Sequence, residues 1–341
     1  MRRIYLTVDT ECHNITQINQ YIYGNKGDDA FGIPKILEVA KELDIPVNFF
    51  LDVCECIRYG NQYIEDIVNL IHRYDQPIWF HFHPNYVSGD DNKSFLWQYS
   101  EDEQRNLLKE GINVYHKYCG KQDRLVFRAG RYGVNPTTYK ILKEFGVEVL
   151  DLSYFSHSAK MCHLPTEELK TLNVPVRYEG VTLLPNTTYI GFDYFKKFHA
   201  FILNVAMTPF NEFRRFIKQT KLNDVVYTMH SWDFIRKWFF AKEYIQGDKY
   251  VIRRFRKCVN VARSQGFVFS SLSDFEFKEN VPDELINLCN GTKGLIMGLF
   301  NNFNRFFGIG RLTPKYFIAT RGLLLFLLAI IVVVLLFIFL V

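Results

Sequence analysis

The sequence lacks the cysteine pattern of a disulfide-stabilised or cysteine-ligated zinc protein. It has 7 cysteines among 341 residues, an odd number, and no CxxC pair. This pattern favours free, buried thiols in a reducing compartment. The residues after Met1 also lack an apolar run long enough for an export signal, since a strand pattern runs directly into Asp9. We therefore expect the catalytic region to lie in the cytoplasm.

A general excess of charge is also missing. The formal net charge is +5, and no acidic residue occurs between Leu285 and Arg321, a stretch that contains five basic residues. Without that stretch the chain is neutral, so the composition does not indicate a nucleic-acid-binding protein.

The C-terminal residues Gly322–Val341 carry no charged or polar side chain. Twenty helical residues span about 30 Å, the thickness of a bilayer core, so the pattern predicts one transmembrane anchor. A buried core helix is the alternative. Lys315 and Arg321 precede the run, which predicts a single-pass protein of the cell inner membrane with a cytoplasmic catalytic domain. Residues 283–321 are basic and aromatic, and we expect them to lie on membrane lipid or, alternatively, to pack as a C-terminal helix.

Residues 1–282 alternate between strand-like and helix-like segments. Continuous apolar strands of this kind are typical of an α/β fold with a largely parallel sheet. About seven strand–helix units favour a barrel-like closure, with chemistry at the C-terminal ends of the strands. The expected strands are Ile4–Val8, Val47–Leu51, Pro77–His83, Leu125–Arg128, Val147–Leu152, Asp224–His230 and Phe267–Phe269. The expected helices are Ile33–Leu43, Tyr63–Tyr74, Asp102–Tyr118, Pro136–Phe145 and Lys249–Gln265, with a small hairpin at Val174–Leu184 and two helical segments in Tyr194–Gln219.

Several of these strands end in ionisable residues. His81 and His83 stand two apart, as do Asp9 and Glu11. On an extended strand, residues i and i+2 point to the same face, so two imidazoles can converge on one metal ion. Two histidines and a carboxylate form an open three-ligand site for a hydrolytic divalent metal such as zinc. An isolated His-x-His pair is often structural, but here a carboxylate, an arginine and a further histidine occur at neighbouring strand ends.

These segments resemble the polysaccharide deacetylases, the NodB-homology carbohydrate esterases. The matching segments are Thr7–Glu11, His81–Pro84, Phe127–Gly133, Asp151 and Met229–Trp232, and the resemblance covers roughly residues 2–275. It implies a distorted (β/α)7 barrel and metal-dependent removal of an N-acetyl group from an amino sugar.

The resemblance also implies a role for each matching residue. It makes Asp9 the general base, His81 and His83 metal ligands, and His230 the general acid. Arg128 would hold Asp9, Asp151 would orient His230, and the backbone near Tyr132 would stabilise the oxyanion.

The sequence departs from the family pattern in three places. Thr10 follows Asp9 where a second aspartate is usual, so Glu11 is expected to supply the metal carboxylate. The usual His-x-x-x-His is here His-x-His, and no proline-containing turn follows Arg128. His13 is an alternative ligand. His72 and His116 lie on helix-like segments and are expected at the surface, whereas His157, His163 and His199 lack ligand spacing. The metal is expected to be Zn²⁺, with iron, cobalt or nickel as alternatives.

Topology and resemblance together predict the substrate. They favour an N-acylated amino-sugar glycan or a lipid-linked sugar at the cytoplasmic membrane face. The alternatives are a metal-dependent phosphoesterase or amidase, and a catalytically degenerate, membrane-tethered protein that only binds glycan.

Overall fold

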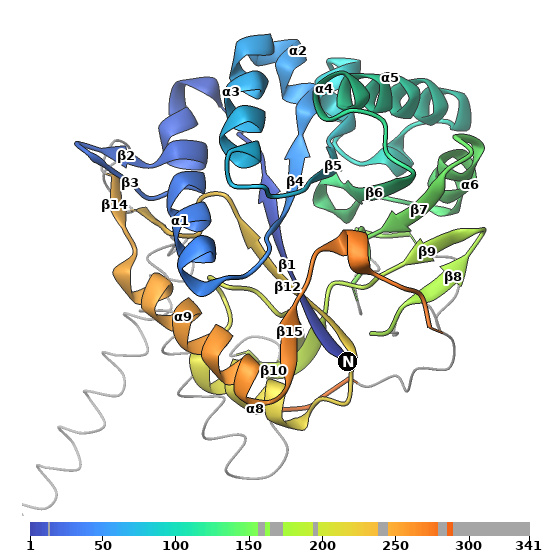
Figure 1. Cartoon of the computed structure of the whole chain (residues 1–341). Coiled ribbons are helices and arrows are strands. Elements are labelled where there is room, and N and C mark those ends of the chain that lie inside the picture. Colours follow the sequence, from blue (N-terminus) through green and yellow to red (C-terminus); the bar gives the residue numbers. More distant parts are fainter. Residues whose placement is uncertain are drawn as a thin grey trace, which may run out of the picture.

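The computed structural model describes residues 1–12, 14–155, 161–163, 173–193, 197–237, 245–278 and 285–288. Its main element is a mostly parallel sheet with the strand order β12-β1-β4-β5-β6-β7-β9-β8, in which β15 also pairs with β1. Figure 1 shows the helices arranged around the outside of this sheet. The chain is therefore an α/β protein, as the alternation of strands and helices predicts.

The strands of the main sheet are β1 (Arg2–Thr10), β4 (Asn48–Asp52), β5 (Ile78–Phe82), β6 (Arg124–Ala129), β7 (Glu148–Asp151), β8 (Val176–Tyr178), β9 (Val181–Leu183), β12 (Asp224–His230) and β15 (Phe267–Phe269). The two-stranded pairs are β2 (Asn25–Lys26) with β3 (Asp29–Ala30), β10 (Thr188–Asp193) with β11 (Lys197–Ile202), and β13 (Ile235–Lys237) with β14 (Ile245–Gly247). The α-helices are α1 (Ile33–Leu43), α2 (Cys56–Tyr59), α3 (Asn61–His72), α4 (Pro84–Ser88), α5 (Glu101–Cys119), α6 (Pro136–Glu144), α8 (Phe210–Gln219) and α9 (Lys249–Ser264).

The apolar faces of the helices pack against buried strands. In α3, for example, Ile64, Ile67 and Ile71 are fully buried at helical spacing, and in β5 every residue is buried. A strand between two covered faces has to be apolar on both sides, which explains the continuous apolar runs in the sequence. Polar residues are tolerated at the strand ends, where the functional site lies.

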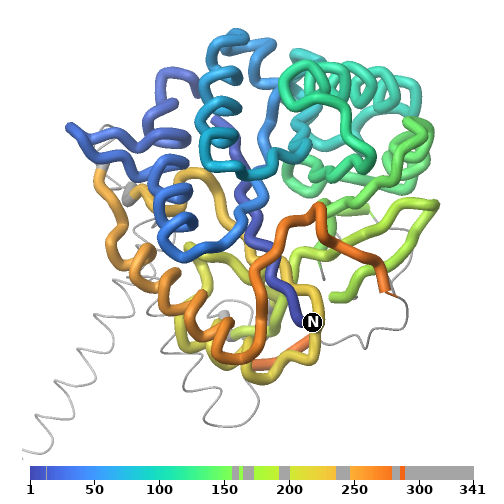
Figure 2. Tube along the Cα trace, viewed as in Figure 1, coloured from blue at the N-terminus to red at the C-terminus, as the bar shows by residue number. Residues whose placement is uncertain are grey.

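The first and last strands described in the main sheet lie side by side. Arg2–Ile4 of β1 pair in parallel with Phe267–Phe269 of β15, and Figure 2 shows the blue N-terminal tube next to the orange segment. Arg3–Asp9 of β1 pair with β12 on one side, and Thr7–Thr10 pair with β4 on the other. β1 is therefore paired along both sides, and Asp9 is held within the sheet.

The predicted fold of a seven-unit barrel with a membrane helix needs correction. Nine strands form the main sheet, and its end strands β8 and β12 do not pair with each other in the described part of the chain. Hydrogen bonds outside the regular strand pairs connect this part of the sheet instead. Leu203 N–H donates to Thr187 O (2.7 Å), and Val205 N–H donates to Thr228 O (2.8 Å). Irregular segments rather than a regular strand thus lie between β9 and β12.

The prediction of two helical segments in Tyr194–Gln219 is only partly correct. Among the described residues of this range only α8 is helical, and Lys197–Ile202 forms strand β11, antiparallel to β10. Pairing with β10 satisfies the backbone of this segment, and such tertiary pairing routinely overrides local propensity.

The predicted transmembrane helix, and the inner-membrane localisation that depended on it, are also corrected. Within the described ranges, no helix has both the length and the apolar character required to cross a bilayer. The predicted anchor Gly322–Val341 belongs to residues 289–341, which lie outside the described residues.

Candidate metal and catalytic site

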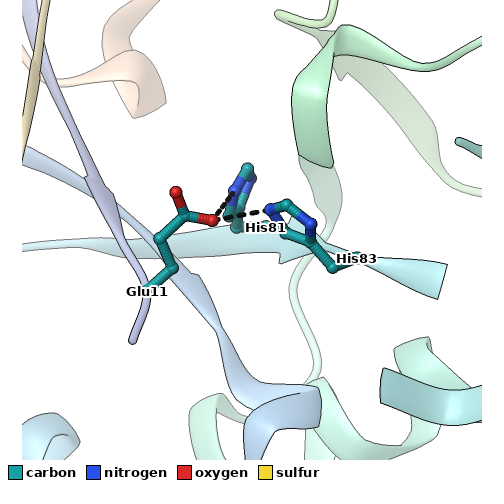
Figure 3. Close-up of side chains that lie close together, drawn as sticks. All are labelled: Glu11, His81 and His83. Atoms are coloured by element: carbon teal, nitrogen blue, oxygen red, sulfur yellow. Dashed lines mark ion pairs between the residues drawn. The ribbon is translucent and has the colours of Figure 1, made fainter. Parts of the chain in front are cut away.

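Glu11, His81 and His83 meet at the C-terminal ends of two strands. Glu11 follows β1, His81 lies in β5, and His83 follows β5 directly. The Glu11 Oε2 atom lies 2.6 Å from His83 Nε2 and 3.4 Å from His81 Nε2 (Figure 3). All three residues are buried, with at most 7% of their surface exposed. The period-two spacing of His81 and His83 places both rings on the same side of the chain, with centroids 5.0 Å apart.

The donor set of this cluster fits a divalent metal ion. Its possible ligand atoms, two imidazole nitrogens and one carboxylate oxygen, all lie within 4.8 Å of one another. His81 Nδ1 lies 3.0 Å from the backbone oxygen of Arg128, so an Nδ1–H tautomer donates there and leaves the Nε2 lone pair facing Glu11. An outer hydrogen bond of this kind commonly orients metal-binding histidines.

His83 gives a second indication. Its Nε2 atom is buried and makes no hydrogen bond of acceptable geometry among the described residues, although Glu11 is close. A buried nitrogen without a hydrogen bond is costly unless another group satisfies it. Two imidazoles and a carboxylate suit zinc, iron, cobalt and nickel alike, and leave further coordination positions open.

Charge within the cluster is strongly coupled. Burial alone would raise the pKa of Glu11, but the neighbouring His83 and His81 side chains hold it well below its ordinary value of 4.5. Burial would lower the pKa of His81, yet the bond to Glu11 and the charge of Asp9 raise it. Glu11 is therefore anionic and attracts positive charge into the buried site.

Asp9 faces a different partner, although it lies only two residues from Glu11. Arg128 Nη1 donates to Asp9 Oδ1. Arg128 has no exposed surface, and its Nη2 donates to Thr7 Oγ1 (3.1 Å) and Asn186 Oδ1 (2.8 Å). Its guanidinium also lies over the Phe50 ring, 4.2 Å from the centroid. This network fixes the position of the Asp9 carboxylate beside the Glu11–His81–His83 cluster.

His230 lies at the end of β12, directly across from Asp9. The two residues are register partners in the β1–β12 pair, and the backbone N–H of Ser231 donates to Asp9 O (2.9 Å). The His230 ring stacks on Trp232, with centroids 4.5 Å apart. His230 is only partly buried, so its ring can meet a ligand that enters from solvent.

The contacts of Asp151 differ from the role that the resemblance implies. Its carboxylate accepts from Ser153 Oγ (2.5 Å) and from Tyr139 OH (3.2 Å). Ser153 Oγ in turn accepts from the Ala129 backbone N–H (2.7 Å), so Asp151 supports the end of β6. Burial raises the pKa of Asp151 to about 7 against the opposing effect of these bonds. The carboxylate bonded to the His230 backbone is that of Asp233, at 3.1 Å.

Tyr132 lies in a strained turn that follows β6. Arg131 and Tyr132 have φ values of 54° and 59°, which non-glycine residues seldom adopt. Such strain is stored mainly at functional sites. The Tyr132 ring contacts Phe155 edge to face at 5.0 Å. Burial and then the Asp9 charge raise the Tyr132 pKa, which places this turn close to Asp9.

Sequence reasoning missed several residues that support the site. Asp52, at the end of β4, accepts from the His83 backbone N–H (3.2 Å), and Glu55 accepts from Cys12 N–H (2.5 Å) and Tyr63 OH (2.6 Å). Gly130 packs against the His83 ring, and Asn186 holds Arg128. Only the position of Asp52 at a strand end could have signalled such a role.

The remaining histidines lie apart from this cluster or outside the described residues. His13 and His157 belong to the undescribed positions. His72 is exposed on α3, and His116 lies on α5. The ring of His163 stacks on Trp97, with centroids 4.2 Å apart.

No model of a known protein family matches the chain, and no curated protein matches it. Its solved neighbours include family 4 carbohydrate esterases. One of them is a mutant of a family 4 pseudoenzyme from Bacillus anthracis in which enzymatic activity was restored. It is 12% identical to this chain, with a TM-score of 0.44. The match covers 80% of this chain but only 66% of the length of that protein. A polysaccharide deacetylase from Bacillus cereus is 13% identical (86% and 100% covered, TM-score 0.40). A family 4 carbohydrate esterase from Streptomyces lividans, solved with acetate, is 10% identical (84% and 98% covered, TM-score 0.40). The likeness to these structures is distant in both sequence and fold.

Proposed function

We propose that this protein is a metal-dependent hydrolase that removes an N-acyl group, acetyl in the simplest case, from an amino sugar of a glycan. The observation that supports the proposal is that a metal-binding cluster and a candidate base lie at the same edge of the sheet. A buried Glu11–His81–His83 cluster suits a divalent metal, and Asp9 lies two residues from Glu11, held by Arg128. The sugar and acyl specificity follow from the resemblance of the sequence segments to polysaccharide deacetylases.

The chain supplies a base and an acid on adjacent strands. A bound divalent ion would polarise the acyl carbonyl and make a water molecule more acidic. Asp9 accepts the proton of the attacking water while its other contacts keep the carboxylate in place. His230, across from Asp9 on β12, donates a proton to the leaving amine as the carbon–nitrogen bond breaks. The products are a carboxylate and a free amino sugar.

The residues around the site support these separate roles of the metal cluster, the base and the acid. The guanidinium of the fully buried Arg128 holds the Asp9 carboxylate in place, while the backbone oxygen of Arg128 lies 3.0 Å from His81 Nδ1. The strained turn at Arg131 and Tyr132 brings backbone groups to the same edge, where they would face the developing negative charge on the acyl oxygen. The prediction of a lipid-linked sugar as the substrate depended on the membrane anchor, so the proposal does not include it.

Acetate release from N-acetylglucosamine oligomers tests the proposal. The full chain, loaded in turn with Zn²⁺, Co²⁺, Fe²⁺ or Ni²⁺, is expected to release acetate, and Asp9→Asn is expected to lose the rate while it keeps its metal. His72→Ala, a change at an exposed histidine, is the matched control. Metal-loaded protein that cleaves p-nitrophenyl phosphate but no N-acylated sugar would instead establish the phosphoesterase alternative. Loaded protein that binds the oligomers but releases no acetate would point to a binding protein.

A further inference from the structure

A second, separate pocket lies between α8 and α9. These two helices contact each other, and Figure 1 shows them side by side at the edge of the molecule. The pocket has a volume of about 360 Å³. Its lining consists of Pro209, Phe210 and Asn211 at the start of α8, and Tyr250, Arg253, Arg254 and Lys257 on α9. None of these residues belongs to the metal and catalytic site.

The charge of the pocket lining is entirely positive. Arg253, Arg254 and Lys257 line it, without any aspartate or glutamate. Across the part of the chain that the structure describes, none of these three cations forms an ion pair within 4.0 Å. Three like charges on one helix face repel each other unless an anion compensates them.

Arg254 is the most informative of the three. Only 5% of its surface is exposed, and its Nη2 donates to Val205 O and Ala206 O, each at 2.7 Å. Its buried Nε atom has no hydrogen-bond partner among the described residues. A buried guanidinium without a carboxylate partner is costly, and an anion in the pocket that Arg254 lines would offset its charge.

The start of α8 adds donors to the same pocket. Pro209 precedes the helix and provides no side-chain cap. The first intrahelical bond is donated by Phe213 to Pro209 O (3.0 Å), so the N–H groups of Phe210 and Asn211 precede it. The N-terminus of a helix carries partial positive charge and favours anions. The nearby acid Glu212 is buried and accepts from Tyr189 OH (2.7 Å) on β10.

We propose that this pocket binds the phosphate group of a phosphate monoester. Guanidinium and ammonium groups together with helix N–H donors match the several acceptor oxygens of a phosphate dianion. Tyr250 is 49% exposed, and its ring lies below Arg254, with the Arg254 Cζ atom 5.4 Å from the ring centroid. It offers an apolar face for the remainder of a small ligand such as a sugar phosphate. The pocket volume exceeds the needs of phosphate alone and falls in the range of small-molecule sites.

Titration calorimetry with the full chain tests this site. The two probes are inorganic phosphate and glucose 1-phosphate, at constant ionic strength set with potassium chloride. We expect saturable 1:1 binding of both, and tighter binding of the ester if the Tyr250 ring contributes. The double variant Arg253→Gln/Lys257→Gln changes two exposed residues, so it keeps the fold. It is expected to weaken phosphate binding by about tenfold or more.

A matched control removes the same charge from a neighbouring surface. Arg214→Gln/Lys218→Gln changes two exposed cations of α8 that do not line the pocket. It is expected to bind phosphate like the parent. No saturable binding of either probe, or an equal loss in both double variants, would overturn the proposal. Acetate release is not part of this test, so its outcome is independent of the proposed hydrolase function.

Discussion

Gly130 lies directly against the imidazole ring of His83. A Cβ atom at Gly130 would come within 2.5 Å of three ring carbons of His83, closer than real Cβ contacts allow. Gly130 follows Arg128 and Ala129 at the end of β6, so the strand that supplies the arginine also shapes the space for a histidine from β5. The position of the His83 ring therefore depends on the absence of one methyl group.

The first prediction follows from this contact. Gly130→Ala is expected to displace the His83 ring and weaken metal binding by about tenfold or more, because misplaced ligands and their supports typically cost 10- to 100-fold in affinity. The measurement is zinc titration against a competing chelator. Gly146→Ala is the control, since a Cβ there meets nothing within 4 Å and the positive φ of 74° makes only the backbone less stable. Equal metal affinities in both variants would show that Gly130 does not position the His83 ring for metal binding.

The second prediction concerns the Arg128 network. Arg128→Met keeps the apolar stem but leaves the buried Asp9 carboxylate without its partner, which should lower the free energy of unfolding by about 3–5 kcal/mol. Asn186→Ala removes one acceptor for Arg128 and the donors to Leu152 O (2.7 Å) and Tyr154 O (2.9 Å), with an expected loss of about 1–3 kcal/mol. Urea denaturation measures both. An Arg128→Met protein as stable as the parent would show that this pair does not hold the strand ends together.

The third prediction uses the pH dependence of stability. The pKa of Asp151 is about 7 in the folded chain and near 3.8 in an unfolded one, with burial as the main cause. Between these values the folded state keeps a proton that the unfolded state has lost, so Asp151 makes stability fall as pH rises from about 4 to 7. The limiting slope for one proton is about 1.4 kcal/mol per pH unit. Asp151→Asn should reduce this fall in stability, as measured by urea denaturation across the interval. Identical slopes in variant and parent would mean that Asp151 titrates normally.

The fourth prediction separates the base from the metal ligands. Asp9→Asn is expected to lower the rate of acyl hydrolysis by a factor on the order of 10² to 10⁴, because an amide cannot accept the proton of the attacking water. Metal content should remain at the parent value, since Glu11, His81 and His83 are unchanged. His230→Gln should lower the rate by a similar factor and also keep the metal. Parent-like turnover by Asp9→Asn would rule out Asp9 as the base.

Much of the fold is predictable from local patterns. The helix at Ile33–Leu43 and the strands at Asp224–His230 and Phe267–Phe269 have the predicted bounds, because continuous apolar runs and helical periodicity reflect burial directly. The segment Lys197–Ile202 is mispredicted since its pairing partner, β10, determines its conformation. Closure near Thr187 and Val205 depends on single bonds between irregular segments, which leave no periodic pattern in the sequence.

The residues of the site also fall into those that the sequence predicts and those that it does not. The grouping of His81 with His83 follows from period-two spacing, and that of Asp9 with Arg128 is implied by the family resemblance. The supporting residues Asp52, Gly130 and Asn186 reach the site from other strand ends and loops, and apart from the strand-end position of Asp52 nothing in their immediate sequence distinguishes them. Contacts of this kind depend on the three-dimensional register of β4, β5 and β6, which local sequence does not encode.

The central claim is that Glu11, His81 and His83 together hold one divalent metal ion. Elemental analysis of the purified full chain, combined with zinc titration, tests it most directly on the parent and on the variants His81→Ala, His83→Ala and Glu11→Gln, with His72→Ala as control. We expect about one ion per chain in the parent and in His72→Ala, and loss of stoichiometric metal in each of the other three folded variants. Full metal retention in both His81→Ala and His83→Ala would contradict it.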